Sequence, residues 1–205
     1  MNVLDRAADG IGAALAMAFD REGWRSKLDD SVDGVFGSFR SVLFAAPLII
    51  LYSATAKRAA DRIPALSHSV YGQLPATALI AADLATFLAD WAASLFLLVM
   101  LARSLGATRR AAGLIVGFNW LQPVIVAIQL PAIALVAAAS STATGGIIAL
   151  PALAFTLTLT WGLIRRGLDA KAAPTAAVVA MLLVIGVVIR ALGDGALRAL
   201  FGVQP

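Results

Sequence analysis

Residues 75–102 read PATALIAADLATFLADWAASLFLLVMLA, an apolar run whose only charged side chains are Asp83 and Asp90. A helix rises about 1.5 Å per residue, so a helix over this run is longer than the hydrocarbon core of a bilayer, which is about 30 Å thick. We therefore predict a tilted membrane-spanning helix that carries two carboxyl groups.

The composition of the whole chain agrees with a membrane location. The 205 residues are 60% hydrophobic and 14% charged, with no cysteine and one histidine, and the mean hydropathy is +0.89. A soluble domain of this length would cover its core with far more charged groups. The lack of cysteine excludes disulfides and thiol chemistry, and a lone His68 argues against histidine-based metal or haem ligation.

Apolar runs elsewhere predict an all-α membrane helix bundle of about five transmembrane helices. The predicted spans cover 38–56, 75–102, 111–139, 145–164 and 174–192, with an uncharged polar turn at 140–146. The first span is short, so Arg40 must extend toward the headgroups. The third contains Pro123 and Pro131, which predict a kink.

The chain before the spans is acidic and amphipathic. Residues 1–34 hold seven acidic and four basic side chains. An apolar stripe at helical spacing consists of Leu4, Ala8, Ile11, Leu15 and Phe19. Asp5, Asp9 and Asp20 lie on the opposite side, so we predict an amphipathic helix that lies in the membrane interface or packs on the spans. The domain organisation is thus an N-terminal segment (1–34), a five-span domain (35–192) and a short tail (193–205).

Lysine and arginine counts predict the orientation, because cytoplasmic loops are enriched in these residues. With the N-terminus inside, eleven basic residues lie on the inner side and five on the outer side. A re-entrant first segment would invert the rest and give ten against six. We therefore expect a multi-pass protein of the bacterial inner membrane, with a cytoplasmic N-terminus and an external C-terminus.

The span over 75–102 divides into three sectors at 100° per residue. A sector of small residues, which we predict to pack on other helices, consists of Ala81, Ala85, Ala89, Ala92 and Ala93. A polar stripe consists of Asp83, Thr86, Asp90 and Ser94. A bulky sector, predicted to face lipid, consists of Leu84, Phe87, Leu88, Trp91 and Leu95.

Two aspartates in a span cost about 2.5–3.5 kcal/mol each on insertion scales, so we expect Asp83 and Asp90 to point into the bundle. Asn119, Gln122 and Gln129 form a second polar stripe on the third span. Depth places Asp90 level with Asn119 and Gln122, and Asp83 near Gln129 and Arg190. Two interpretations remain open: the stripes hydrogen bond as interhelical glue, or they form a proton or cation pathway or a cavity for a polar ligand.

The layout over 35–192 resembles the Yip (Ypt-interacting) superfamily of small five-span proteins. Phe39-Arg40-Ser41 with Ala46-Pro47, and Gly117-Phe118-Asn119-Trp120, also resemble small membrane proteins of alphaproteobacteria. The resemblance implies membrane organisation or protein interaction, with no catalytic residue to carry over.

Two functional hypotheses follow. The first is a non-enzymatic scaffold in the lipid bilayer that binds other membrane proteins or a second copy of itself. The second is a small transporter or channel component that moves protons, cations or a polar solute between the second and third spans. Phosphate loops, nucleophile elbows, zinc spacings and nucleic-acid modules are absent from the sequence, so we predict no enzyme, cofactor, metal or nucleic-acid partner.

Overall fold

The computed structural model describes residues 3–139 and 142–203, and all regular elements within these ranges are helical. The five long helices are α4 (Ser41–Arg62), α6 (Ala76–Ser104), α7 (Ala111–Ala139), α8 (Thr142–Leu168) and α9 (Ala172–Phe201). The short elements are α1 (Val3–Ala18), α2 (Trp24–Lys27), α3 (Val32–Ser38), η1 (Pro64–Leu66), α5 (Val70–Gln73) and η2 (Thr108–Arg110). The predicted all-α helix bundle with an N-terminal helix is confirmed.

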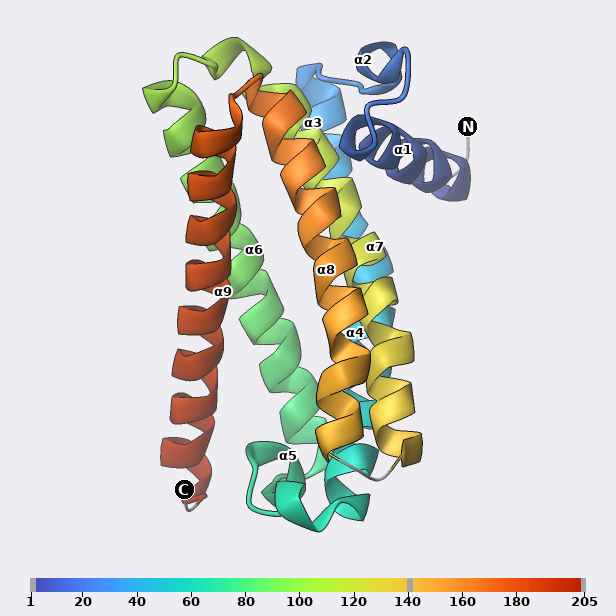
Figure 1. Cartoon of the computed structure of the whole chain (residues 1–205), viewed down its shortest axis with the longest axis vertical. Coiled ribbons are helices and arrows are strands. Elements are labelled where there is room, and N and C mark those ends of the chain that lie inside the picture. Colours follow the sequence, from blue (N-terminus) through green and yellow to red (C-terminus); the bar gives the residue numbers. More distant parts are fainter. Residues whose placement is uncertain (1–2, 140–141, 204–205) are drawn as a thin grey trace.

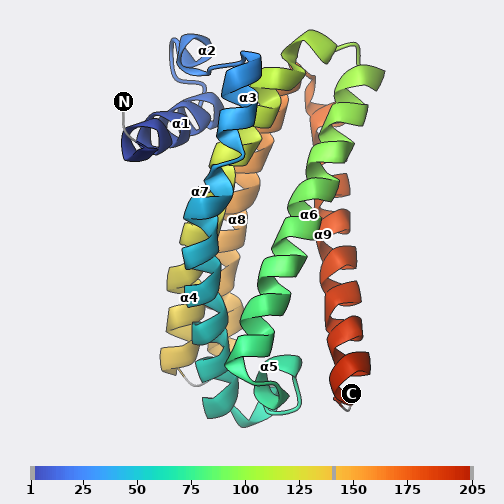
Figure 2. The ribbon, with the colours of Figure 1, turned by 180° about the vertical axis from the view of Figure 1, so that it is seen from behind.

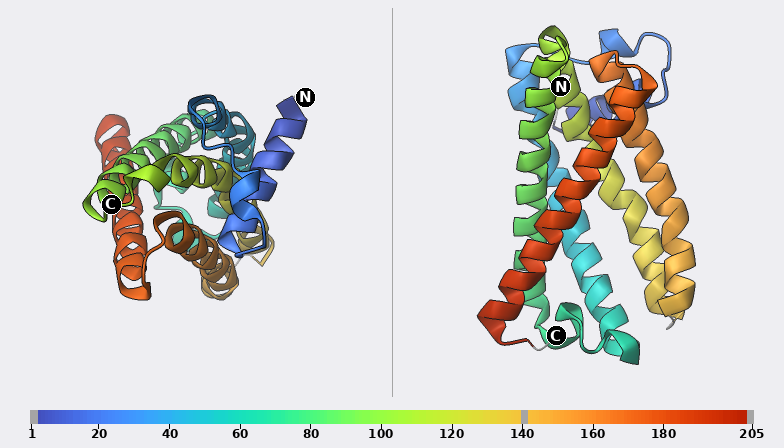
Figure 3. Two further views of the ribbon diagram at one scale, coloured as in Figure 1. Left: turned by 90° about the horizontal axis from the view of Figure 1, so that it is seen from above. Right: turned by 60° about the vertical axis from the view of Figure 1, so that its left-hand side comes forward.

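The long helices stand side by side and close a ring, which is visible from above in Figure 3. Around the ring, α4 contacts α7, α7 contacts α8, α8 contacts α9, α9 contacts α6, and α6 contacts α4. Helices α8 and α9 diverge away from their connection (Figure 3). The N-terminus lies near the end that holds α2, here called the upper end, and the C-terminus lies at the lower end beside α5 (Figure 1).

Four helical stretches are long and apolar enough to cross a membrane: Val32–Arg62, Ala76–Ser104, Thr108–Ala139 and Ala172–Phe201. Large apolar side chains such as Leu43, Phe96 and Val187 are exposed on the outside of the ring, as expected for surfaces that contact lipid. These features fit a multi-pass membrane protein.

The fifth predicted span falls on α8, which packs along α7. It stays a prediction, because part of 145–164 lies outside the residues whose side chains are described. The predicted polar turn over 140–146 is helical from Thr142 onward, where α8 begins. Its first two residues lie outside the described ranges.

Helix boundaries differ most from the predicted spans in the first span and in α9. The first span is divided at Phe39 and Arg40 into α3 and α4, and α4 continues to Arg62. In Figure 2, α4 runs along the bundle down to the lower end, which contradicts a re-entrant first segment. Helix α9 extends to Phe201, so most of the predicted tail is helical.

Helix α1 lies across the upper part of α7 and α8 (Figure 1). Its buried face is built mostly of small residues: Ala7, Ala13, Ala14, Ala16, Met17 and Ala18. The predicted stripe is therefore only partly right, because Ile11 and Leu15 pack on the core whereas Leu4 is 69% exposed. The reason is close approach: a Cβ atom at Gly162 of α8 would lie 2.0 Å from the Ala18 carbonyl oxygen.

Candidate functional site

A polar cluster joins four helices in the lower half of the ring. It consists of Ser53 on α4, Tyr71 on α5, Asp83 on α6 and Arg190 on α9, and is called the lower cluster below. The Asp83 carboxylate accepts hydrogen bonds from Ser53 Oγ (2.6 Å), the Tyr71 hydroxyl (2.7 and 2.8 Å) and Arg190 Nη1 (2.8 Å). Asp83 is only 9% exposed, so these donors replace the water that a carboxylate needs.

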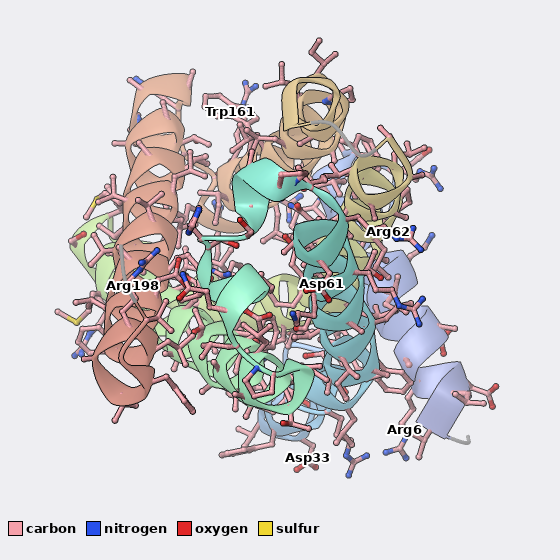
Figure 4. All side chains as sticks on the ribbon, turned by 90° about the horizontal axis from the view of Figure 1, so that it is seen from below. Arg6, Asp33, Asp61, Arg62, Trp161 and Arg198 are labelled. Atoms are coloured by element: carbon pink, nitrogen blue, oxygen red, sulfur yellow. The ribbon has the colours of Figure 1, made fainter. Side chains whose placement is uncertain are left out.

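Arg190 and Tyr71 complete this cluster. Nη2 of Arg190 donates to the Tyr71 hydroxyl at 2.6 Å, and its Nε lies 3.4 Å from Asp194, one turn further along α9. Burial raises the pKa of Tyr71 above its ordinary value, so at neutral pH the hydroxyl keeps its proton and donates a hydrogen bond to Asp83. In Figure 4, the segment around α5 lies across the lower end of the ring. The lower cluster therefore ties that segment to the spans.

A cavity of about 270 Å³ lies within the ring and is not fully enclosed. It is bounded by α4, α6, α7 and α9, and we call it the central cavity. Its polar lining consists of Tyr52, Asp83, Thr86, Asp90, Gln129 and Arg190, and its apolar lining includes Ile49, Phe87, Ile125 and Val126. The cavity is large enough for several water molecules or a small hydrated cation.

Asp90 faces this cavity in surroundings unlike those of Asp83. Its Oδ1 is buried and has no hydrogen-bond partner among the described residues. Gly186 of α9 lies opposite: a Cβ atom there would be 3.5 Å from Oδ1 of Asp90. About two helical turns further along α9, a Cβ atom at Gly193 would lie 2.9 Å from Oγ1 of Thr86. Two glycines on α9 thus let the polar stripe of α6 approach closely.

A second polar cluster, the upper cluster, joins α3, α6 and α7. Asn119 of α7 is fully buried and accepts a hydrogen bond from Trp91 Nε1 at 2.9 Å. Its Nδ2 donates to Ser38 Oγ at 2.8 Å, and Ser38 in turn donates to the Val35 carbonyl at 2.6 Å. The oxygen and the nitrogen of the Asn119 amide each have a hydrogen-bond partner, so this cluster links the three helices to one another.

The structure brings some predicted site residues together and separates others. Asp83, Thr86, Asp90 and Gln129 all line the central cavity, and the expected proximity of Arg190 to Asp83 is confirmed. Asp90 does not pair with Asn119 or Gln122. Asn119 belongs to the upper cluster, and Gln122 donates to the Phe118 carbonyl of its own helix at 3.4 Å. Ser94 is buried on the inner side of α6.

The faces of α6 are arranged differently from the prediction. Ala81, Ala85, Ala89 and Ala92 are exposed on the outside of the ring. The bulky sector, predicted to face lipid, instead points mostly inward: Phe87 lines the cavity, Trp91 and Leu95 pack on the core, and only Leu88 is exposed. The physical reason is that these large side chains fill the space between α6 and α7, which small residues would leave empty.

Sequence reasoning missed several residues of the site. Ser53 and Tyr71 lie in a span and a loop whose sequences give no sign of a carboxylate partner. Gly186 and Gly193 carried a usable signal, because glycines seven residues apart share one helix face and permit close approach.

Comparison of the chain with protein-family models, with curated proteins and with solved structures finds no match. The chemistry of the site therefore rests on its geometry. It offers one carboxylate with its donors in place, one carboxylate with an unsatisfied oxygen, and a cavity that both side chains line. No group of metal ligands of histidine, cysteine and carboxylate type is found among the described residues.

Proposed function

We propose that the protein moves protons or small cations across the membrane through the central cavity, with Asp90 as the group that takes them up. The observation that carries this proposal is the unsatisfied Oδ1 of Asp90 at the cavity. A carboxylate in a membrane interior needs a proton, a cation or hydrogen-bond donors. Asp83 has donors from three helices, whereas Asp90 leaves room for a proton or a cation.

The two polar clusters bound the region in which Asp90 lies. Along α6, Asp83 of the lower cluster precedes Asp90 by seven residues, and Trp91 of the upper cluster follows it directly. Transport requires access to Asp90 from each side in turn, as in carriers whose site lies near the midplane. In this proposal the lower cluster closes the site toward α5 and the upper cluster closes it toward α3.

Flux through liposomes that contain the purified protein tests this function. Proton, Na⁺ and K⁺ entry is measured with internal fluorescent indicators under an imposed membrane potential. We expect flux above that of empty liposomes for at least one ion, and about a tenfold or greater loss in Asp90→Asn, because the neutral amide does not take up a proton and lacks the charge that would hold a cation. Asp61→Asn, at an exposed carboxylate of the lower end, is the matched control and should keep the flux. Equal flux in wild type and Asp90→Asn would exclude the proposal.

A scaffold function is the second candidate, supported by the exposed alanine sector of α6. Small residues on a lipid-facing helix allow another helix to approach closely, and membrane organisation is what the resemblance to the Yip family implies. In this candidate, which likewise requires no enzymatic activity, α6 binds a second copy or another protein of the inner membrane. Ala85→Cys in the cysteine-free chain should then form an intermolecular disulfide, whereas Leu43→Cys on α4 should not. Equal cross-linking of both variants would contradict it.

A further inference from the structure

A separate pocket of about 140 Å³ lies at the upper end of the ring, and four arginines line it. Arg25 comes from α2, Arg109 and Arg110 come from η2, and Arg166 comes from α8. Two glycines, Gly113 and Gly167, also line the pocket. Segments that lie far apart in the sequence thus bring four guanidinium groups to one small space.

The charges around this pocket leave a positive excess. Arg110 pairs with Asp169 at 2.6 Å, and Arg166 lies 3.0 Å from Asp20. Neither Arg25 nor Arg109 forms an ion pair with any residue that the structure describes. Among the described residues that line the pocket, Asp30 is the only acid. Two unpaired guanidinium groups against one carboxylate leave a single positive charge.

Arg166 is held in place beside the pocket. Its Nη1 donates to the Ala18 carbonyl at 2.8 Å, and its Nε lies 3.0 Å from the Asp20 carboxylate. Arg25 lies over the ring of Trp24, with its Cζ atom 4.6 Å from the ring centroid. Both arginines are thus positioned by neighbouring groups, and the guanidinium of Arg25 has no anionic partner among the described residues.

The position of the pocket identifies the kind of acceptor. The stretch Ala76–Ser104 ends and the stretch Thr108–Ala139 begins beside it, so it lies at the level of the lipid headgroups. Planar guanidinium groups bind phosphate oxygens through paired hydrogen bonds. We propose that this pocket binds a phosphodiester group, whose single negative charge matches the excess. A phospholipid headgroup and a soluble phosphodiester share this chemistry.

Native mass spectrometry of the detergent-solubilised protein tests the proposal. The probes are dioleoyl-phosphatidylglycerol and its soluble headgroup, glycerophosphoglycerol. We expect wild type to bind at least one of them, and Arg25→Gln and Arg109→Gln to bind about tenfold more weakly through loss of a charged donor. Arg58→Gln, an exposed arginine at the lower end, is the control and should bind as wild type does. Binding of the lipid alone assigns the site to a headgroup, and binding of both probes assigns it to the phosphodiester itself.

A second measurement needs no variant. In wild type, dioleoyl-phosphatidylglycerol should outcompete dioleoyl-phosphatidylcholine, whose choline ammonium is repelled by the excess positive charge. The proposal is overturned if wild type binds neither probe, if Arg25→Gln and Arg109→Gln both bind like wild type, or if the two lipids bind equally well. Ion flux is not part of either readout, so the result is independent of the function proposed for Asp90.

Discussion

Asp83 and Asp90 are both aspartates of α6, but only the Asp83 carboxylate is satisfied by hydrogen-bond donors. Asp83 accepts from Ser53, Tyr71 and Arg190, whereas Oδ1 of Asp90 accepts from no described residue. A carboxylate with its donors in place stabilises a bundle, and one without them costs free energy unless it is neutralised. The two side chains therefore differ in role, although both lie on the same polar stripe of the sequence.

This difference predicts opposite effects of one conservative substitution. Asp83→Asn removes the negative partner of Arg190 and should lower the free energy of unfolding by about 1–3 kcal/mol. We expect the lower part of this range because the Arg190 side chain is 41% exposed and solvent screens the pair. Asp90→Asn removes a charge without a partner and should leave the stability unchanged or raise it. Thermal unfolding in detergent measures both variants, and an equal loss in the two would contradict the assignment.

At the scale of elements, helices and their approximate bounds could be predicted from the sequence, but their orientations within the bundle could not. Apolar length and flanking charges placed α6, α7 and α9. The alanine and bulky sectors of α6 were predicted incorrectly, because lipid is as apolar as a protein interior and hydropathy does not distinguish the two surfaces. Only the polar stripe was informative: Asp83, Asp90 and Ser94 face inward, as the cost of an aspartate in lipid requires.

The close contact between α1 and α8 predicts that one added methyl group, in Gly162→Ala, displaces α1. Gly162→Ala would place a Cβ atom against the backbone oxygen of Ala18, so α1 must move away from the ring. Gly12→Ala is the matched control, since a Cβ atom there meets nothing within 4 Å. Met17→Cys reports the movement, because Met17 lies on the buried face of α1. We expect its thiol to react faster in the Gly162→Ala background and unchanged in the Gly12→Ala background. Equal rates in both would show that α1 does not depend on this contact.

For the whole molecule, the ion pair of Arg190 with Asp83 increases the difference in basic residues between the two ends. The sequence count assigns Arg190 to the outer side, but its guanidinium binds Asp83 within the bundle. The basic residues of the lower end are then Lys57, Arg58, Arg62 and Arg198, against eleven at the upper end. This larger excess favours a cytoplasmic upper end.

The orientation that we predict in a bacterial inner membrane determines which loops a membrane-impermeant thiol reagent should reach in intact cells whose outer membrane has been made permeable. His68→Cys, in the exposed segment between η1 and α5, should react from outside. Thr108→Cys, at the start of η2, should react only after the inner membrane is opened. The reverse pattern would place the C-terminus in the cytoplasm.

The central claim is that Asp90 faces a space that water reaches, and reactivity of a thiol placed opposite it is the most direct test. Gly186→Cys puts a Cβ atom at ordinary contact distance from the Asp90 carboxylate, and Val187→Cys puts one on the adjacent, outward face, where Val187 is 69% exposed. Both variants are treated with a water-soluble, membrane-impermeant reagent in sealed membrane vesicles of each orientation. We predict that Gly186→Cys reacts from at least one side and that Val187→Cys, surrounded by lipid, does not. A Gly186→Cys thiol that is unreactive from both sides would contradict an aqueous cavity at Asp90.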